Sequence, residues 1–280
     1  MDPFLRRKIT DRVVTVLCVL ATLLAVIPLV SVLIYVGSQG IAGLSGSFFT
    51  SLPKPVGEAG GGMANAIVGS LIVVGIACAI GIPLGIAAGV YVSEFEDGRF
   101  ARLVRFSADV LGGVPSIVVG IFVYALIVVR TKHFSAWAGG LALAVIMLPT
   151  IVRTTEELLR LVPASLREAA LALGVPKWKT TVFVVLRTAL PGIATGVMLA
   201  VARVASETAP LLFTAFNNRF WAESLNDPTA TLPVQIFTYS VSPYDDWQKQ
   251  AWAGALTLVA LVLVLNLLAK VVVGRRARTR

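Results

Sequence analysis

Long apolar runs separated by short polar segments dominate the chain. Five runs suit a membrane-crossing helix, and a sixth apolar stretch, over residues 181–216, is too long for one upright crossing. Crossing the hydrocarbon core takes about 20 mostly apolar residues, so this pattern predicts an all-α membrane protein with six transmembrane helices. The five clear runs are Arg12–Val36, Ala64–Val92, Ser107–Val129, Ala138–Ile151 and Ala251–Val273.

The fifth span allows two interpretations. It is either Val182–Ala205, or Leu190–Phe216 preceded by a short amphipathic helix over Lys177–Arg187. At 1.5 Å per residue, Arg203 lies about 32 Å along the first alternative, near the outer interface, and about 20 Å along the second, inside the hydrocarbon. We favour the second alternative, which agrees with a motif described below.

Composition excludes the main classes of soluble protein. The 280 residues are 57% hydrophobic and 14% charged, with a mean hydropathy of +0.86, whereas soluble domains carry about 25% charged residues. A soluble enzyme, a disordered chain and a disulfide scaffold are therefore excluded. The first apolar run, at about 24 residues, exceeds a signal-peptide core, so residues 1–11 are expected to precede an uncleaved first span.

Basic residues follow the membrane topology. With the N-terminus inside, eighteen Lys and Arg residues fall in inside segments and five in outside segments, a bias that predicts that both termini are cytoplasmic. The membrane domain then covers residues 12–273, with a cytoplasmic loop at about 153–190, an external loop at about 217–250 and a basic tail at 274–280. This distribution explains the net charge of +9 without a nucleic-acid partner.

Residues for catalysis or metal binding are sparse. The single histidine, His133, has no second ligand near it, and Cys18 and Cys78 both fall inside apolar runs, so we predict neither a metal site nor a catalytic triad. The segment Gly174–Thr180 has Trp where a phosphate-binding P-loop needs glycine before lysine. If transport is driven by ATP, another subunit hydrolyses it.

The inside loop is the most informative segment. Glu156, Glu157 and Arg160 indicate that the fourth helix continues into the cytoplasm, and Ala164–Leu173 predicts a short helix beyond it. Gly174 supplies the left-handed residue that commonly ends a helix. Two short helices joined at a glycine make a compact projection, which either docks in a partner's groove or covers the bundle as a lid.

A motif in this loop resembles one found in a known family. Glu168, Ala169 and Ala170, followed after three residues by Gly174 and later by Leu-Pro at Pro191, resemble the EAA motif of ABC-importer permease subunits. The resemblance implies the type I permease fold and a coupling helix that seats in a cytoplasmic ATPase. One departure is that Arg187 stands where the family pattern has proline, which affects only where the fifth span begins.

Four further segments narrow the resemblance to the A-type permease of the high-affinity phosphate importer. They are Gly112–Val118, Leu148–Glu157, Ser206–Thr214 and Thr231–Phe237. The resemblance implies an inner-membrane complex with a sister permease, two copies of an ATPase that uses ATP and Mg²⁺, and an external phosphate-binding protein, with no cofactor bound by this chain. The alternatives are a permease for sulfate or molybdate, an ATP-independent secondary transporter and, last, a membrane enzyme.

Two charges inside the fifth apolar stretch are candidates for the pathway. Arg203 and Glu207 stand at i and i+4, and ionisable groups at bilayer depth are usually functional. Arg203 offers a bidentate guanidinium to a tetrahedral oxyanion, and Glu207 accepts a hydrogen bond from protonated phosphate, which sulfate cannot donate. The alternative is an internal ion pair, but the resemblance favours the pathway. Asp109, in the first turn of the third span, is expected to be structural.

Overall fold

The computed structural model describes residues 3–58, 60–96 and 98–278, and the ordered elements of this part of the chain are helical. In chain order they are α1 (Pro3–Gly43), α2 (Gly46–Thr50), α3 (Ala64–Glu94), α4 (Arg99–Gly113), α5 (Ser116–Val123), the π-helix η1 (Tyr124–Val128), α6 (Val129–Thr131), α7 (Ala136–Arg160), α8 (Ala164–Ala172), α9 (Lys177–Lys179), the π-helix η2 (Thr180–Val185), α10 (Leu186–Ala205), α11 (Ala209–Thr214), α12 (Leu232–Ser240) and α13 (Asp245–Arg278).

The number of spans agrees with the prediction. Among the described residues, five helices are long and apolar enough to cross a membrane, and the number is six when α4 and the α5–α6 segment, which are bent by 108°, are counted as one span. The expected N-terminal segment 1–11 is helical from Pro3 onward. The basic tail 274–280 is helical to Arg278, and its last two residues lie outside the described part.

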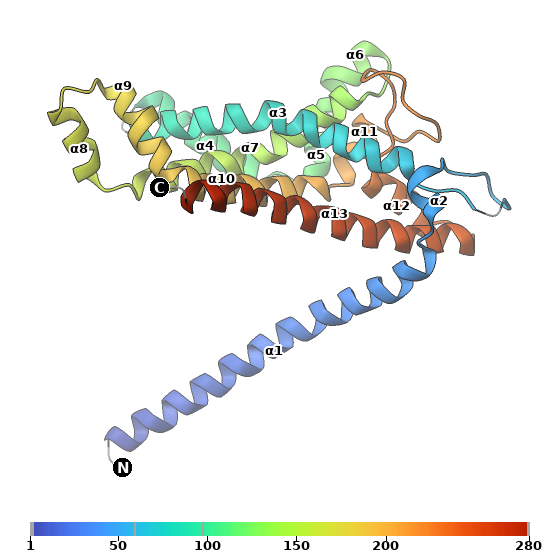
Figure 1. Cartoon of the computed structure of the whole chain (residues 1–280), viewed down its shortest axis with the longest axis horizontal. Coiled ribbons are helices and arrows are strands. Elements are labelled where there is room, and N and C mark those ends of the chain that lie inside the picture. Colours follow the sequence, from blue (N-terminus) through green and yellow to red (C-terminus); the bar gives the residue numbers. More distant parts are fainter. Residues whose placement is uncertain (1–2, 59, 97, 279–280) are drawn as a thin grey trace.

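Apart from α1, the long helices lie along one axis (Figure 1). Helix α7 packs against α3 and α10, and α13 packs against α10 and α12. One end of the bundle carries α8 and α9, and we call it the coupling end; the opposite end, with α2, α6 and α12, is the loop end. The expected external loop 217–250 is thus not irregular throughout, because it contains α12.

Helix α1 diverges from the bundle (Figure 1). It touches α13 near the loop end, where the Tyr35 and Trp252 rings lie 5.2 Å apart edge to face. The most apolar stretch of α1 is otherwise uncovered by the rest of the chain. An apolar surface of this kind is suited to lipid or to a helix of another subunit.

Helices α3 and α7 form the tightest pair in the bundle. Their contact is a stripe of glycines on α3 that recur every four residues and face residues that recur every four on α7. The facing pairs are Gly81–Met147, Gly85–Ile151 and Gly89–Thr155, where an added Cβ would come within 2.8, 2.7 and 2.6 Å of the opposing side chain. Residue numbers increase in the same direction along both helices at these contacts, so the helices are parallel. Because glycine has no side chain, the two backbones approach closely, as is common in membrane bundles.

The third span is broken, which corrects the prediction of one helix over Ser107–Val129. Helix α4 ends at Gly113, Val114 and Pro115 are extended, and α5 begins at Ser116, with a bend of 108° between the two halves. The residue before proline is disfavoured in the α region, which accounts for the extended Val114. Because residues 112–115 adjoin the middle of α7, the span breaks at mid-depth.

The fifth span also differs from the favoured interpretation. A continuous helix runs over Lys177–Ala205, so Lys177–Arg187 is not a separate helix, and Leu190–Phe216 is wrong as a single helix because the chain breaks after Ala205 and resumes in α11. The end of the alternative Val182–Ala205 is correct.

The early part of this long helix projects beyond the bundle. Gly192 and Gly196 of α10 face Leu158 and Thr154 of α7, so these helices are antiparallel. Leu158 is two residues from the end of α7, so residue 190 lies at the level of that end and residues 177–189 extend past it at the coupling end. Depth inside the bundle must be counted from about residue 190, even though the helix begins at Lys177.

Candidate translocation and coupling sites

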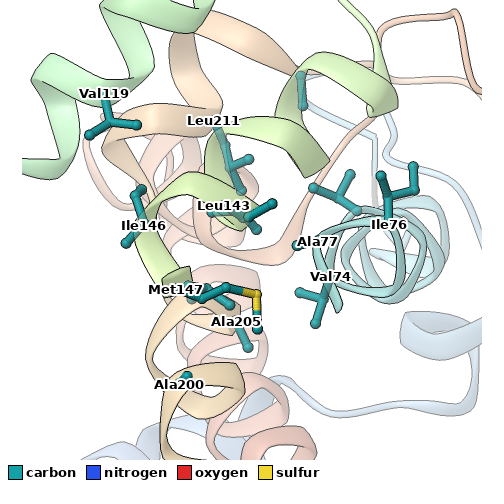
Figure 2. Close-up of a cluster of buried hydrophobic side chains, with 14 of the residues drawn as sticks. Val74, Ile76, Ala77, Val119, Leu143, Ile146, Met147, Ala200, Ala205 and Leu211 are labelled. Carbon is teal, nitrogen blue, oxygen red and sulfur yellow. The ribbon is translucent and has the colours of Figure 1, made fainter. Parts of the chain in front are cut away.

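The breaks in the third and fifth spans lie next to each other. A Cβ added to Gly120 of α5 would lie 2.5 Å from the Cα of Pro210 in α11, and Val119 and Leu211 belong to one buried cluster (Figure 2). Non-helical backbone at membrane depth is tolerated only where protein covers it or water reaches it. Two adjacent broken spans therefore mark the place in this bundle best suited to a transport pathway.

Arg203 and Glu207 flank the break in the fifth span. Arg203 is in the last turn of α10, and Glu207 stands just before α11, with 3.9 Å between Arg203 Nε and Glu207 Oε1. Ala205, between them, packs in the same cluster as Met147 (Figure 2). Met147 lies eleven residues into α7, about 16 Å from the start of that helix at 1.5 Å per residue. For a hydrocarbon core about 30 Å thick that begins at Ala136, this is the middle of the membrane.

The two charges are not equally covered. The side chain of Arg203 is 56% exposed, whereas that of Glu207 is 18% exposed. A charged side chain at this depth faces a bundle interior, a water-filled cavity or another subunit rather than lipid. The exposed guanidinium therefore points to a pathway or an intersubunit surface. The 3.9 Å separation is a loose ion pair, which leaves donors of Arg203 free for a ligand.

The coupling loop has the geometry that its sequence predicts. Helix α8 follows Pro163 and ends in a turn at Gly174, whose φ of +77° is left-handed. The N–H of Gly174 donates to Leu171 O at 2.9 Å, and that of Val175 to Ala170 O at 3.2 Å. These bonds satisfy carbonyls that would otherwise be orphaned at the helix end. The glycine lets the chain reverse there at no steric cost.

The motif residues of this loop divide between the bundle and solvent. Ala170 is buried, while Glu168, Ala169 and Gly174 lie at the surface. Within the described part of the chain, the Glu168 carboxylate has no ion-pair partner. Exposed leucines accompany it, with Leu173 at 84%. An exposed apolar patch is typical of an interaction surface, so the exposure favours docking over a lid.

A buried carboxylate organises the coupling end, although the sequence indicated only a charged helical extension there. Glu156 of α7 is 2% exposed and pairs with three arginines. Arg105 and Arg160 approach it at 2.8 Å, and Arg153 at 3.4 Å. Burying a carboxylate is costly unless it is paired. The sequence does hold a signal for two of these pairs, because Arg153 and Arg160 stand at i−3 and i+4 from Glu156 and so share a face of one helix. Arg105 belongs to α4, which is distant in sequence, and could not be found in this way.

Asp109 is also placed differently from the expectation. It lies near the end of α4 rather than in a first turn, so a helix N-terminus does not account for it. Its carboxylate instead accepts hydrogen bonds from Arg153. Asp109 therefore belongs to the set of ion pairs that joins α4 to α7.

The fold defines the class of protein. An inward-facing methionine ABC transporter, MetNI, aligns with a TM-score of 0.64 at 20% identity, covering 78% of this chain and 96% of that chain. A bacterial alginate ABC transporter aligns with a TM-score of 0.67 at 12% identity and 94% coverage of both. The architecture is that of a type I ABC-importer permease.

Sequence comparison places the chain within this class. The model of the family described as "Binding-protein-dependent transport system inner membrane component" matches residues 81–278. The "Phosphate transport system permease protein PstA" of Yersinia pestis is 46% identical over 271 residues, which cover 96% of this chain and 92% of that protein. The protein of the same name from Pasteurella multocida is 42% identical, with 97% of both covered. The chain belongs to the PstA family of multi-pass inner-membrane permeases.

Proposed function

We propose that this chain is a membrane-spanning subunit of an ATP-driven importer that moves inorganic phosphate into the cytoplasm by alternating access. The observation that carries the proposal is the 46% identity to a phosphate permease over nearly the whole chain. The broken spans and the projecting loop support it, because alternating access needs elements that move and a surface through which a motor moves them.

The partners follow from the same assignment. Both termini are in the cytoplasm, and the chain pairs with a sister permease, two copies of an ATP-binding subunit and an external phosphate-binding protein. ATP and Mg²⁺ act in the ATP-binding subunits, and this chain binds no cofactor. The exposed Arg203 at mid-depth supports the sister subunit, since a second permease closes the side of the pathway that one chain leaves open.

Arg203 and Glu207 form the phosphate-contacting part of the pathway. The guanidinium donates two parallel hydrogen bonds to phosphate oxygens. Glu207 accepts a hydrogen bond from the P–OH group of singly protonated phosphate. Sulfate, which is fully ionised at neutral pH, leaves that carboxylate without a donor, and this difference favours phosphate.

The loop of Glu168, Ala169, Ala170 and Gly174 seats in the ATP-binding subunit. Its exposed carboxylate and leucines supply the contact, and Ala170 holds the helix against η2. ATP-driven closure of the ATPase pair then moves α8 and, with it, the bundle.

Uptake of labelled phosphate at micromolar concentration tests this function in cells that lack only this gene, with sulfate and molybdate measured in parallel. We expect selective loss of phosphate uptake, restored by the wild-type gene and not by Gly174→Trp. Gly174→Asn is the matched control, because asparagine tolerates a left-handed helix end. Intact phosphate uptake with loss of sulfate or molybdate uptake would instead assign another oxyanion.

A further inference from the structure

Arg167, next to the exposed Glu168, faces the bundle rather than solvent. Its Nη1 pairs with Glu94, the last residue of α3, and its Nη2 donates to the carbonyl of Leu159 in the last turn of α7 at 3.2 Å. The Glu94 side chain is only 8% exposed. Within the described part of the chain, this is the ion pair that ties α8 to the membrane helices.

The two groups that Arg167 holds belong to one rigid unit. Glu94 ends α3, and Leu159 lies next to the end of α7; these helices are locked together by the glycine stripe from Gly81 to Gly89. Bundles packed at such density shift as units rather than deform continuously. A displacement of α8 that is carried by Arg167 therefore displaces α3 and α7 together.

The same unit is joined to the broken third span. Glu156 of α7 pairs with Arg105 of α4, and Arg153 of α7 pairs with Asp109 of α4. Helix α4 leads directly to the 108° break at mid-depth. Polar contacts thus link α8 to the ends of α3 and α7 and link α7 to α4, and the packed α3–α7 pair joins the two sets.

We propose that Arg167 is a positioning residue for coupling: with Glu94 it forms the strut through which motion of α8 is transmitted to the α3–α7 pair, and it does not take part in docking the ATPase. This inference rests on the proposed function. It separates two roles inside one short helix, since exposed Glu168 faces the partner and Arg167 faces the bundle.

A double-mutant cycle in the reconstituted four-component complex tests the strut. Phosphate moved per ATP hydrolysed is measured for wild type, Arg167→Ala, Glu94→Ala and the double variant, together with retention of the ATPase on the purified complex. We expect each single change to lower phosphate moved per ATP by about fivefold, the double change to lower it no further, and ATPase retention to stay unchanged, because paired residues give non-additive effects. Arg187→Ala, an exposed arginine of the same end of the bundle, is the control and should behave as wild type.

Three outcomes would overturn the strut. A wild-type ratio in Arg167→Ala would show that α8 moves the bundle without it. Additive losses in the double variant would show that Arg167 and Glu94 do not act together. Loss of the ATPase from the Arg167→Ala complex would make Arg167 part of the docking surface. Failure of the proposed function itself is distinguishable, because the wild-type complex would then show no phosphate transport coupled to ATP.

Discussion

The α3–α7 pair and the two broken spans cross the same membrane in opposite ways. In the pair, two continuous helices meet along glycines. In the broken spans, the chain leaves the helix at residues 114–115 and 206–208. Proline alone does not make the difference. Pro83 and Pro149 lie inside continuous helices, whereas Pro115 stands at a break.

The surroundings of Pro115 and Pro149 explain the contrast between these two prolines. Pro115 follows Gly112 and Gly113, which have the lowest helix propensity after proline itself, and in the described part of the chain a Cβ added at Gly113 would meet nothing within 4 Å. Pro149 is buried in the packed bundle, so packing holds its helix together. Whether a segment stays helical or bends thus depends on what surrounds a residue as much as on its type. We call the α3–α7 pair the stiff frame, and the broken spans beside it are the hinge.

The largest expected effect breaks the stiff frame. Gly85→Leu forces a side chain into Ile151, since a Cβ added at Gly85 would already lie 2.7 Å from that isoleucine, and overpacking typically costs about 1–3 kcal/mol of folding free energy. We expect the purified complex to be lost or its yield to fall about tenfold or more. Gly75→Leu on the same helix is the matched control, since nothing lies within 4 Å of a Cβ added at Gly75. Equal yields of the two variants would contradict the rigid-pair interpretation.

The second effect concerns the broken region and leaves the frame intact. Arg203→Ala removes a charged hydrogen-bond donor, and a hydrogen bond to a charged group contributes about 1.5–3 kcal/mol of binding free energy. We therefore expect phosphate uptake to fall about 10- to 100-fold with normal assembly. Arg203→Lys should restore part of the flux, because it keeps the charge but not the bidentate geometry. Normal uptake in Arg203→Ala would leave the residue a purely structural role, and loss of assembly would place it at the subunit contact.

Sequence reasoning predicted the number of apolar spans and the helix–turn geometry of the inside loop, but not the course of the third and fifth spans. Six apolar runs are a direct consequence of bilayer thickness, and the turn at Gly174 follows from local backbone preference, so neither depends on distant contacts. The mid-depth location of Arg203 stays a prediction, which rests on counting depth from Leu190, although the helix containing it begins at Lys177 and ends at Ala205.

The interior ion pairs could not be predicted in the same way. Glu156 meets Arg105 across 51 positions of sequence, and Arg167 meets Glu94 across 73, so only the packing of α4, α3 and α8 brings the charges together. The break at Pro115 escaped prediction for a related reason. The sequence of the third span is apolar enough to be one helix, and whether a proline bends or breaks a helix depends on its neighbours in space.

The smallest expected effect compares two prolines directly. Pro115→Ala lets α4 and α5 gain helix across the break, and we expect it to slow phosphate uptake about two- to fivefold, which corresponds to a shift of about 0.5–1 kcal/mol between the bent and straighter forms. Pro83→Ala, within the continuous helix α3, is the control and should leave uptake within about 1.5-fold of wild type, a difference of about 0.2 kcal/mol. If both variants slow uptake equally, proline acts through general helix stability. If only Pro115→Ala does so, the bend in the third span is part of the transport cycle, because the frame helix tolerates the same change.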